Sequence, residues 1–342
     1  MQMSTLGPAV SVLMPVYNGE RYLSEAIESV LGQTFVEFEL VIVDDGSRDA
    51  SVEIAEAWAR RDQRIRLVLQ DHLGLVPALN RGLAEVRGTW VARMDADDIC
   101  VPDRLAAQMG YLARHHDVTL LGTYARHIGE DGRVLGMYRL GPSSREEWKR
   151  IIAQGRLIQM IHASIMMNRD AVVREGGYDQ RFRYVEDVEL YNRMAIKGHL
   201  SIAMPEPKLL VRIHADSVVM RSHMEMWRMM RFVRAVTLAR RTGREIDWAE
   251  FEQLEGASSR VRRAATKLGD VGSYLYRRAG AEFGRGHAVQ GGMLFGAGFV
   301  LAPGRVAGKV ATQILPLWRE RVCRWSQRLR DRRRRSGPSR AG

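Results

Sequence analysis

The sequence predicts an α/β fold in which a doubly wound, mixed sheet is flanked by helices and followed by a mainly helical C-terminal extension. Two observations support this prediction. Strand-like apolar runs alternate with helix-like segments through the first hundred residues, and strand signals stop after about residue 222. The 342 residues, 46% of them hydrophobic and 27% charged, suit a globular domain with an appendage.

The first hundred residues hold the regular part of this pattern. Apolar runs predict four strands, at 10–16, 40–44, 65–69 and 89–95. Apolar residues at three- and four-residue spacing predict three intervening helices, at 22–31, 51–61 and 76–86. Polar residues follow the first, second and fourth runs. Because doubly wound sheets bind ligands at the carboxyl ends of their strands, we expect the chemistry at that edge.

The pattern becomes mixed after residue 100. Helices are predicted at 102–116, 144–154 and 185–197, and strands at 118–126, 163–167 and 209–214, with a turn at 130–132 before another extended piece. Long helical stretches follow at 224–241 and 259–278. We therefore expect a domain at 1–221, a helical extension at 222–318 and a tail at 319–342.

Positive charge is concentrated in the tail. The formal net charge is +12, and residues 319–340 contain ten arginines and two acidic residues, a net charge of +8. The uncharged segment 288–304 precedes it, but 17 residues are marginal for a membrane span, which needs about 20. We expect this segment to be buried, interfacial or re-entrant, and the tail to rest on an anionic membrane surface. The alternative is a solvated tail.

Cysteine usage and the N-terminus indicate the compartment. Cys100 and Cys323 lie far apart and match no metal or redox spacing, and residues 1–8 contain no secretory pattern. We therefore expect a cytoplasmic protein, with peripheral attachment to the inner face of the cell membrane as a further expectation.

An acidic triplet follows the fourth apolar run. Asp95 and Asp97 stand one residue apart, so both carboxylates can reach one metal-bound group. Hard oxygen ligands of this kind suit Mg²⁺ or Mn²⁺, completed by substrate phosphates and water. Taken alone, such a triplet is more often a solvated loop or a helix cap, and Asp98 before Pro102 fits a cap.

Five ordered motifs at compatible spacing resemble those of the family 2 inverting glycosyltransferases, which have the Rossmann-like GT-A fold. They are SVLMPVYN (11–18), QTF leading to VDDGS (33–35 and 43–47), NRG (80–82), DADD (95–98) and ED (186–187). The resemblance covers roughly residues 10–220. It implies a nucleotide-sugar half over about 1–100, an acceptor half over 101–221, and transfer of a sugar from a nucleotide diphosphate donor to an acceptor hydroxyl with inversion.

The resemblance also implies roles for individual residues. Those implied in nucleotide-sugar binding are Pro15, Tyr17, Asn18, Asp45, Asn80 and Asp95. Asp97 is implied as the metal ligand, with His214 completing the metal or diphosphate site. An aromatic ring can pack on a base, and a carboxylate can accept from a base N–H or a ribose hydroxyl. Taken singly, Tyr17 would be a half-buried strand residue, Asp45 part of a turn and His214 a core residue.

Inversion requires a base that deprotonates the acceptor hydroxyl. Asp187 matches the family's base, and Glu186 is implied to orient it or the acceptor. The same two residues also suit the acidic first turn of a helix, and both interpretations can hold together. No feature of the sequence selects Arg81, Arg93 or Arg104 as a phosphate ligand.

The expected donor is a UDP-sugar, and the expected acceptor is a carbohydrate or a lipid-linked molecule in bacterial surface polysaccharide or glycolipid assembly. A nucleotidyltransferase is the chemical alternative, although residues 16–20 are not a glycine-rich phosphate loop. The other alternative is a non-catalytic protein that binds nucleic acid or membrane on the same scaffold. Nucleic acid is not the expected partner, because the arginines lie outside the folded motifs.

Overall fold

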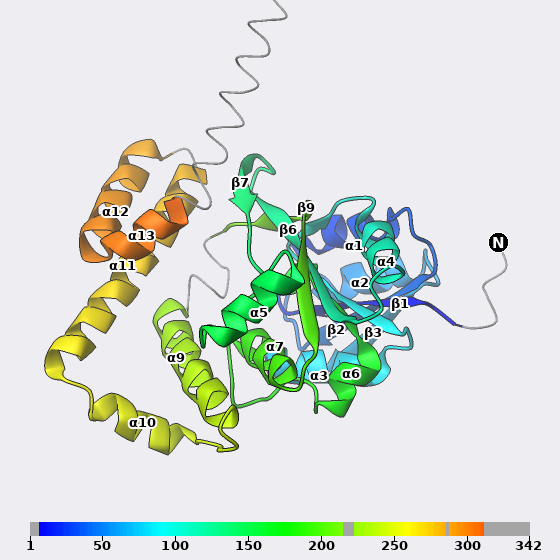
Figure 1. Cartoon of the computed structure of the whole chain (residues 1–342). Helices are drawn as coiled ribbons and strands as arrows, with labels where there is room; N and C mark the ends of the chain where they lie inside the picture. The colour runs from blue at the N-terminus through cyan, green and yellow to red at the C-terminus, as the bar shows by residue number, and fades with distance from the viewer. Residues whose placement is uncertain (1–6, 215–221, 285–286, 311–342) are drawn as a thin grey trace, which may run out of the picture.

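The computed structural model describes residues 7–214, 222–284 and 287–310. A nine-stranded sheet lies at the centre of the N-terminal part, with helices on both faces (Figure 1). Its strands are β1 (Val10–Val16), β2 (Phe38–Asp45), β3 (Ile65–Gln70), β4 (Trp90–Arg93), β5 (Ile99–Cys100), β6 (Val118–Ile128), β7 (Val134–Tyr138), β8 (Met166–Asn168) and β9 (Leu200–Arg212). The helices are α1 (Leu23–Leu31), α2 (Ser51–Ala59), α3 (Leu75–Glu85), α4 (Arg104–Leu112), α5 (Arg145–Ala153), α6 (Arg169–Arg174) and α7 (Glu186–Ile196), with a 3₁₀ turn at His162–Ser164.

The sheet is doubly wound at one end and mixed at the other. Its strand order is β3-β2-β1-β4-β8-β6-β9-β5, with β7 paired to β6. β1 runs parallel to β2 and β4, whereas β8 runs antiparallel between β4 and β6. The predicted α/β fold with a mixed sheet is therefore confirmed. The chain reverses its winding between β1 and β4, and such a switch point opens a crevice at the carboxyl ends of the strands.

Two apolar layers hold the sheet between its helices. All residues of β1 and β2 are buried, as their unbroken apolar runs predict for parallel strands covered on both faces. Side chains alternate between the faces, so Val12 and Met14 pack on the side of α1, α2 and α4. Leu13 packs on the other side, against α3.

The main differences from the predicted elements have local causes. β5 has two residues and α6 has six, too few for a period to be recognised. β9 was predicted only at 209–214, because Pro205 and Pro207 interrupt its apolar pattern. In the structure β9 passes through both prolines, and its register with β6 shifts at that point. β4 ends at Arg93, so Asp95 lies in the following loop.

Five helices follow the sheet in the part of the chain that the structure describes. They are α9 (His223–Arg240), α10 (Trp248–Gly256), α11 (Arg260–Gly284), α12 (Ala288–Leu301) and α13 (Pro303–Lys309). A small core of Phe182, Val188, Phe232 and Val236 joins α9 to α7. No helix of the residues described is long and apolar enough to cross a bilayer. The domain boundary at residue 221 stays a prediction, and the basic tail at 319–342 lies outside the described residues.

Gly82 and Gly110 form a matched pair of helical glycines. A Cβ at Gly82 in α3 would collide with Leu13 Cδ1 on β1, whereas at Gly110 in α4 the nearest atom would be Arg114 Nη1 at 3.9 Å. We expect Gly82→Ala to lower the free energy of unfolding by about 1–3 kcal/mol through overpacking. Gly110→Ala should raise it by up to about 1 kcal/mol through helix propensity. Denaturant unfolding checks both, and equal effects would contradict the close approach of α3 to β1.

Candidate active site

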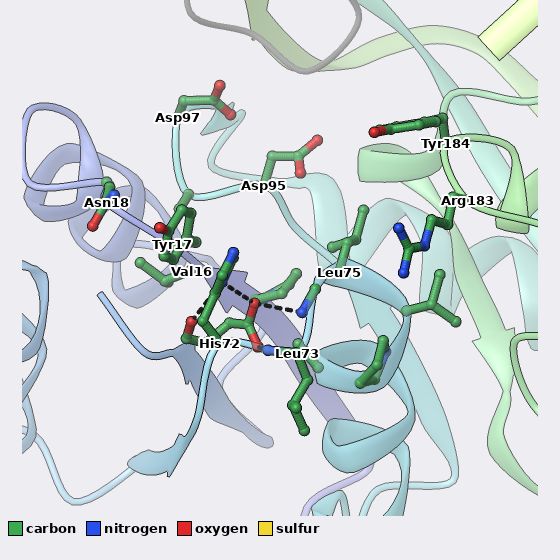
Figure 2. Close-up of a pocket in the computed structure, with 18 of the residues that line it drawn as sticks. Val16, Tyr17, Asn18, His72, Leu73, Leu75, Asp95, Asp97, Arg183 and Tyr184 are labelled. Atoms are coloured by element: carbon green, nitrogen blue, oxygen red, sulfur yellow. Dashed lines mark hydrogen bonds and ion pairs between the residues drawn. The ribbon is translucent and has the colours of Figure 1, made fainter. Parts of the chain in front are cut away.

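A cleft of about 820 Å³ opens at the carboxyl ends of β1, β2 and β4 (Figure 2). Figure 2 shows Asp95 between Tyr17 on one side and Arg183 and Tyr184 on the other. The predicted site residues that line the cleft are Pro15, Tyr17, Asn18, Asp45, Asp95, Asp97 and His214. Strands far apart in the sequence thus bring these residues to one edge, as the doubly wound pattern predicts.

An aromatic pair forms one end of the cleft. Tyr17 and His72 stack with ring centroids 3.9 Å apart and planes 17° from parallel, and Tyr17 is 44% exposed. Asn18, with φ 51°, adopts a left-handed conformation that asparagine tolerates better than most residues. Its N–H donates to Ser47 Oγ, and its Oδ1 accepts from Arg48 N. Asn18 therefore joins the loop after β1 to the loop after β2.

Asp45 organises the wall of the cleft. Its Oδ1 accepts from Gln70 Nε2 at 2.6 Å and from Leu73 N at 2.9 Å. Its Oδ2 accepts from Gly74 N at 2.9 Å, and His72 Nδ1 lies 2.9 Å away. A carboxylate offers about four lone-pair sites, and the three hydrogen bonds use most of them. The carboxylate thus holds the loop that carries His72, and the implied contact of Asp45 with base or ribose stays a prediction.

Asn80 does not line the cleft, and its implied contact with the nucleotide-sugar stays a prediction. Its Nδ2 donates to Tyr178 O at 2.8 Å, and its Oδ1 accepts from Tyr178 N at 2.9 Å. Both polar atoms of the amide are thus used in fastening the segment before α7 onto α3.

The acidic triplet forms a compact cluster. One oxygen each from Asp95, Asp97 and Asp98 lies within 4.8 Å of the others, and His214 Nε2 lies 2.8 Å from Asp97 Oδ2. Burial raises the pKa of Asp95, and burial together with the charge of Asp97 raises that of Asp98 well above its ordinary value. Asp98 Oδ2 is buried and has no hydrogen-bond partner among the described residues. Crowded oxygens beside an imidazole fit a divalent cation such as Mg²⁺ or Mn²⁺.

Two buried arginines hold this cluster, and sequence reasoning assigned a role to neither. Arg93 is 3% exposed and forms an ion pair with Asp95. Arg212 is 5% exposed, and its Nε donates to Asp97 O while its backbone N–H donates to Asp98 Oδ1. Both arginines end apolar strands, β4 and β9. A charged residue within an apolar run was the signal that could have identified them, because such a charge needs a buried partner.

Glu186 and Asp187 begin α7 beside the cleft, although neither lines it. Burial and the charge of Asp187 raise the pKa of Glu186 to about 8. Burial also raises the pKa of Asp187, to about 6. The charges of Arg93 and Asp95 act on both carboxyls, so this pair lies within electrostatic reach of the acidic cluster. Burial therefore favours the protonated form of both carboxyls, and Glu186 is shifted further than Asp187.

Neutral polar groups surround Glu186. His162 Nε2 lies 2.9 Å from the Tyr178 hydroxyl, and its Nδ1 lies 3.9 Å from Glu186 Oε1. Burial lowers the pKa of His162 well below its ordinary value, so the ring is neutral. Glu186 Oε2 has no hydrogen-bond partner among the described residues. One buried oxygen of Glu186 is thus left available as a hydrogen-bonding group beside the neutral His162 ring.

Comparison with known proteins identifies relatives of this arrangement. The family model described as "Glycosyl transferase family 2" matches residues 11–177. The putative glycosyltransferase EpsE of Bacillus subtilis (strain 168) is 36% identical over 220 residues, which cover 63% of this chain and 77% of EpsE. The amylovoran biosynthesis glycosyltransferase AmsE of Erwinia amylovora is 33% identical over 211 residues, covering 61% and 77% of the two chains.

Solved structures agree on the fold. The crystal structure of S. aureus TarS 1–349 in complex with UDP-GlcNAc superposes with a TM-score of 0.54 at 17% identity. The superposition covers 82% of this chain and 88% of the TarS chain. At this identity it shows only that the two chains share the GT-A fold. The extent of the sequence matches decides the family. With its strand order, its acidic cluster and these relatives together, the chain belongs to glycosyltransferase family 2 and is a glycosyltransferase of GT-A fold.

Proposed function

We propose that this glycosyltransferase transfers a sugar from a uridine diphosphate donor to an acceptor hydroxyl, with inversion at the anomeric carbon. The observation that carries the proposal is the cluster of Asp95, Asp97 and Asp98 beside His214, in a cleft whose other end is the aromatic pair of Tyr17 and His72. TarS, of similar fold, was crystallised with UDP-GlcNAc, and we extend that donor class to this chain only as part of the proposal.

The donor would span the cleft from the aromatic pair to the acidic cluster. The exposed ring faces of Tyr17 and His72 suit a planar base, and Pro15 and Asn18 complete that end. Asp97 and His214 would hold Mg²⁺ or Mn²⁺, with Asp95 supporting the ribose or a metal-bound water. A bound divalent cation supplies charge neutralisation for a departing diphosphate.

Asp187 is the proposed base. Its ionised carboxylate takes the proton of the acceptor hydroxyl as that oxygen forms a bond to the anomeric carbon. The bond from the anomeric carbon to the diphosphate oxygen breaks on the opposite face, and the nucleoside diphosphate leaves with the electron pair. Because burial and the charge of Asp187 raise the pKa of Glu186 to about 8, Glu186 favours its protonated form and can donate a hydrogen bond that orients the acceptor.

For the acceptor and the location, we propose only a class of molecule and a compartment. AmsE is named for amylovoran biosynthesis, which favours a carbohydrate or lipid-linked acceptor in surface polysaccharide or glycolipid assembly. We place the enzyme in the cytoplasm, with the arginine-rich tail on the anionic inner face of the cell membrane.

Product analysis with UDP-sugars tests the reaction class. Release of UDP with an inverted anomeric centre supports the proposal, and release of pyrophosphate would contradict it.

Asp97→Asn should weaken UDP binding in the presence of Mn²⁺ by at least about tenfold, because it removes a charged ligand of the proposed cation. Calorimetric titration of UDP, with Mn²⁺ and then with EDTA, measures the effect. Asp170→Asn is the matched control, since Asp170 is exposed at the start of α6, at the sheet edge opposite the cleft. Wild-type UDP binding that is equally strong in EDTA would refute the cation site.

Asp187→Asn should lower kcat by roughly 10²–10⁴-fold while leaving the Kd for UDP nearly unchanged, because the amide cannot take the proton. Glu186→Gln should lower kcat much less, since glutamine resembles the neutral acid that burial favours. Steady-state kinetics and UDP titration on the same preparations separate the two effects. An Asp187→Asn enzyme with near-normal turnover would remove Asp187 from the base role.

The pH profile of kcat should reflect the raised pKa of Asp187. The base works only when ionised, so kcat should fall about tenfold per pH unit below the Asp187 pKa of about 6. The measurement is kcat at saturating donor and acceptor, with circular dichroism at each pH to confirm folding. Full activity at about pH 4.5, where an ordinary carboxyl group is still largely ionised, would contradict the raised pKa of Asp187.

A further inference from the structure

Helix α12 carries an exposed apolar face that no described residue covers. Val289, Met293 and Val300 are 76%, 64% and 78% exposed, and the sequence from Ala288 to Leu301 contains no ionisable residue. Because residues three, four and seven apart share one side of a helix, these three side chains line up with Ala297. We call Val289, Met293, Ala297 and Val300 the α12 stripe.

The opposite side of α12 is closely packed, so the stripe is the outward face of a defined helical pair. A Cβ at Gly298 would lie 2.8 Å from Gly272 O on α11, and a Cβ at Gly291 would lie 2.7 Å from the Phe283 ring. Glycines therefore allow the backbones of α11 and α12 to approach each other. This packing fixes which side of α12 faces α11, and the stripe lies on the opposite side.

A buried carboxylate fastens the helical pair to the body of the protein. Asp270 on α11 is 2% exposed and accepts from Arg231 Nη1 on α9 at 2.8 Å and from Arg305 Nη1 on α13 at 2.9 Å. The Arg305 guanidinium also lies over the Trp227 ring of α9, 5.3 Å from its centroid. Three helices thus meet at one charge, which holds the stripe in place relative to α9.

The length and charge of this region favour a lipid surface over other partners. Fourteen residues make a helix of about 21 Å, short of the roughly 30 Å needed to span a hydrocarbon core. Beyond α13 the sequence continues into residues 319–340, with their ten arginines. Positive charge of this size opposes the association of two copies of the chain, whereas anionic lipid attracts it.

We propose that the α12 stripe docks onto an anionic lipid bilayer, with α12 lying along the interface and its apolar side chains entering the headgroup boundary. A helix with one apolar face and cationic flanks binds in this way through apolar burial and charge together. Docking at this face requires neither donor nor acceptor. Its test is therefore independent of the test of the reaction proposed above.

Helix α11, against which α12 packs, lies near the acceptor half. Burial raises the pKa of Tyr138 on β7, and the charges of both Arg277 on α11 and Asp187 act on it. Helix α11 and the proposed base thus share a neighbour on β7.

Vesicle flotation of the full chain tests the docking. Vesicles of phosphatidylcholine with phosphatidylglycerol, compared with phosphatidylcholine alone, are used at low salt and at about 1 M NaCl, where the Debye length of about 3 Å screens charge attraction. Wild type should retain a salt-resistant bound fraction. V289D/M293D/V300D should lower this salt-resistant partitioning at least about tenfold, because three carboxylates would enter the apolar boundary.

Matched single variants test the same proposal if the triple variant fails to fold. Leu254→Asp makes a comparable change on α10, at an apolar residue that is 56% exposed and outside the stripe. Met293→Asp should weaken salt-resistant binding, and Leu254→Asp should not. Equal binding of these two variants, or wild-type binding that vanishes at high salt, overturns the proposal. A dimer in sedimentation that Met293→Asp dissociates also overturns it and assigns the stripe to contact between copies.

Discussion

The ion pair between Arg93 and Asp95 is the interaction around which both halves of the site are arranged. Carboxylates removed from water repel one another, and here those of Asp97, Asp98 and Asp187 lie within electrostatic reach of Asp95. A buried cation makes such a cluster tolerable, provided that its partners are close. Burial lowers the pKa of Arg93, but Asp95, Tyr178 and Asp98 raise it, and the net shift is upward, so the guanidinium stays charged. The same charge favours the ionised form of Asp187 on the acceptor side.

The backbone of Arg93 ties this pair to the sheet. Its N–H donates to Ile165 O, and its carbonyl accepts from the buried Arg104 Nη2 at 2.8 Å. Arg104 is therefore a structural residue of the core rather than a phosphate ligand. A charge placed at the end of a central strand is held more rigidly than one on a loop, which suits a group that must act on two neighbouring sites.

Loops at the cleft are held by side chains that accept backbone hydrogen bonds. Asp45 gathers the N–H groups of residues 73 and 74, Asn80 pairs with the backbone of Tyr178, and Asp98 accepts from Arg212 N. Irregular segments lack the ladder bonds of strands and helices, so buried polar side chains satisfy their backbone groups instead. The C-terminal helices are joined differently, because the carboxylate of Asp270 on α11 accepts from the guanidinium groups of Arg231 on α9 and Arg305 on α13.

Local pattern in the sequence determined the order of strands and helices, the mixed α/β class and the edge at which polar motifs gather. These follow from periodicity and from the parallel winding, which need only near neighbours in the chain. The family resemblance also rested on short motifs. Tertiary structure alone decided that Asp45 and Asn80 fasten loops, that Arg93 is a buried counter-ion and that α12 faces outward. Those outcomes depend on partners far apart in sequence, as with Asn80 and Tyr178, 98 residues apart, and no local pattern encodes such partners.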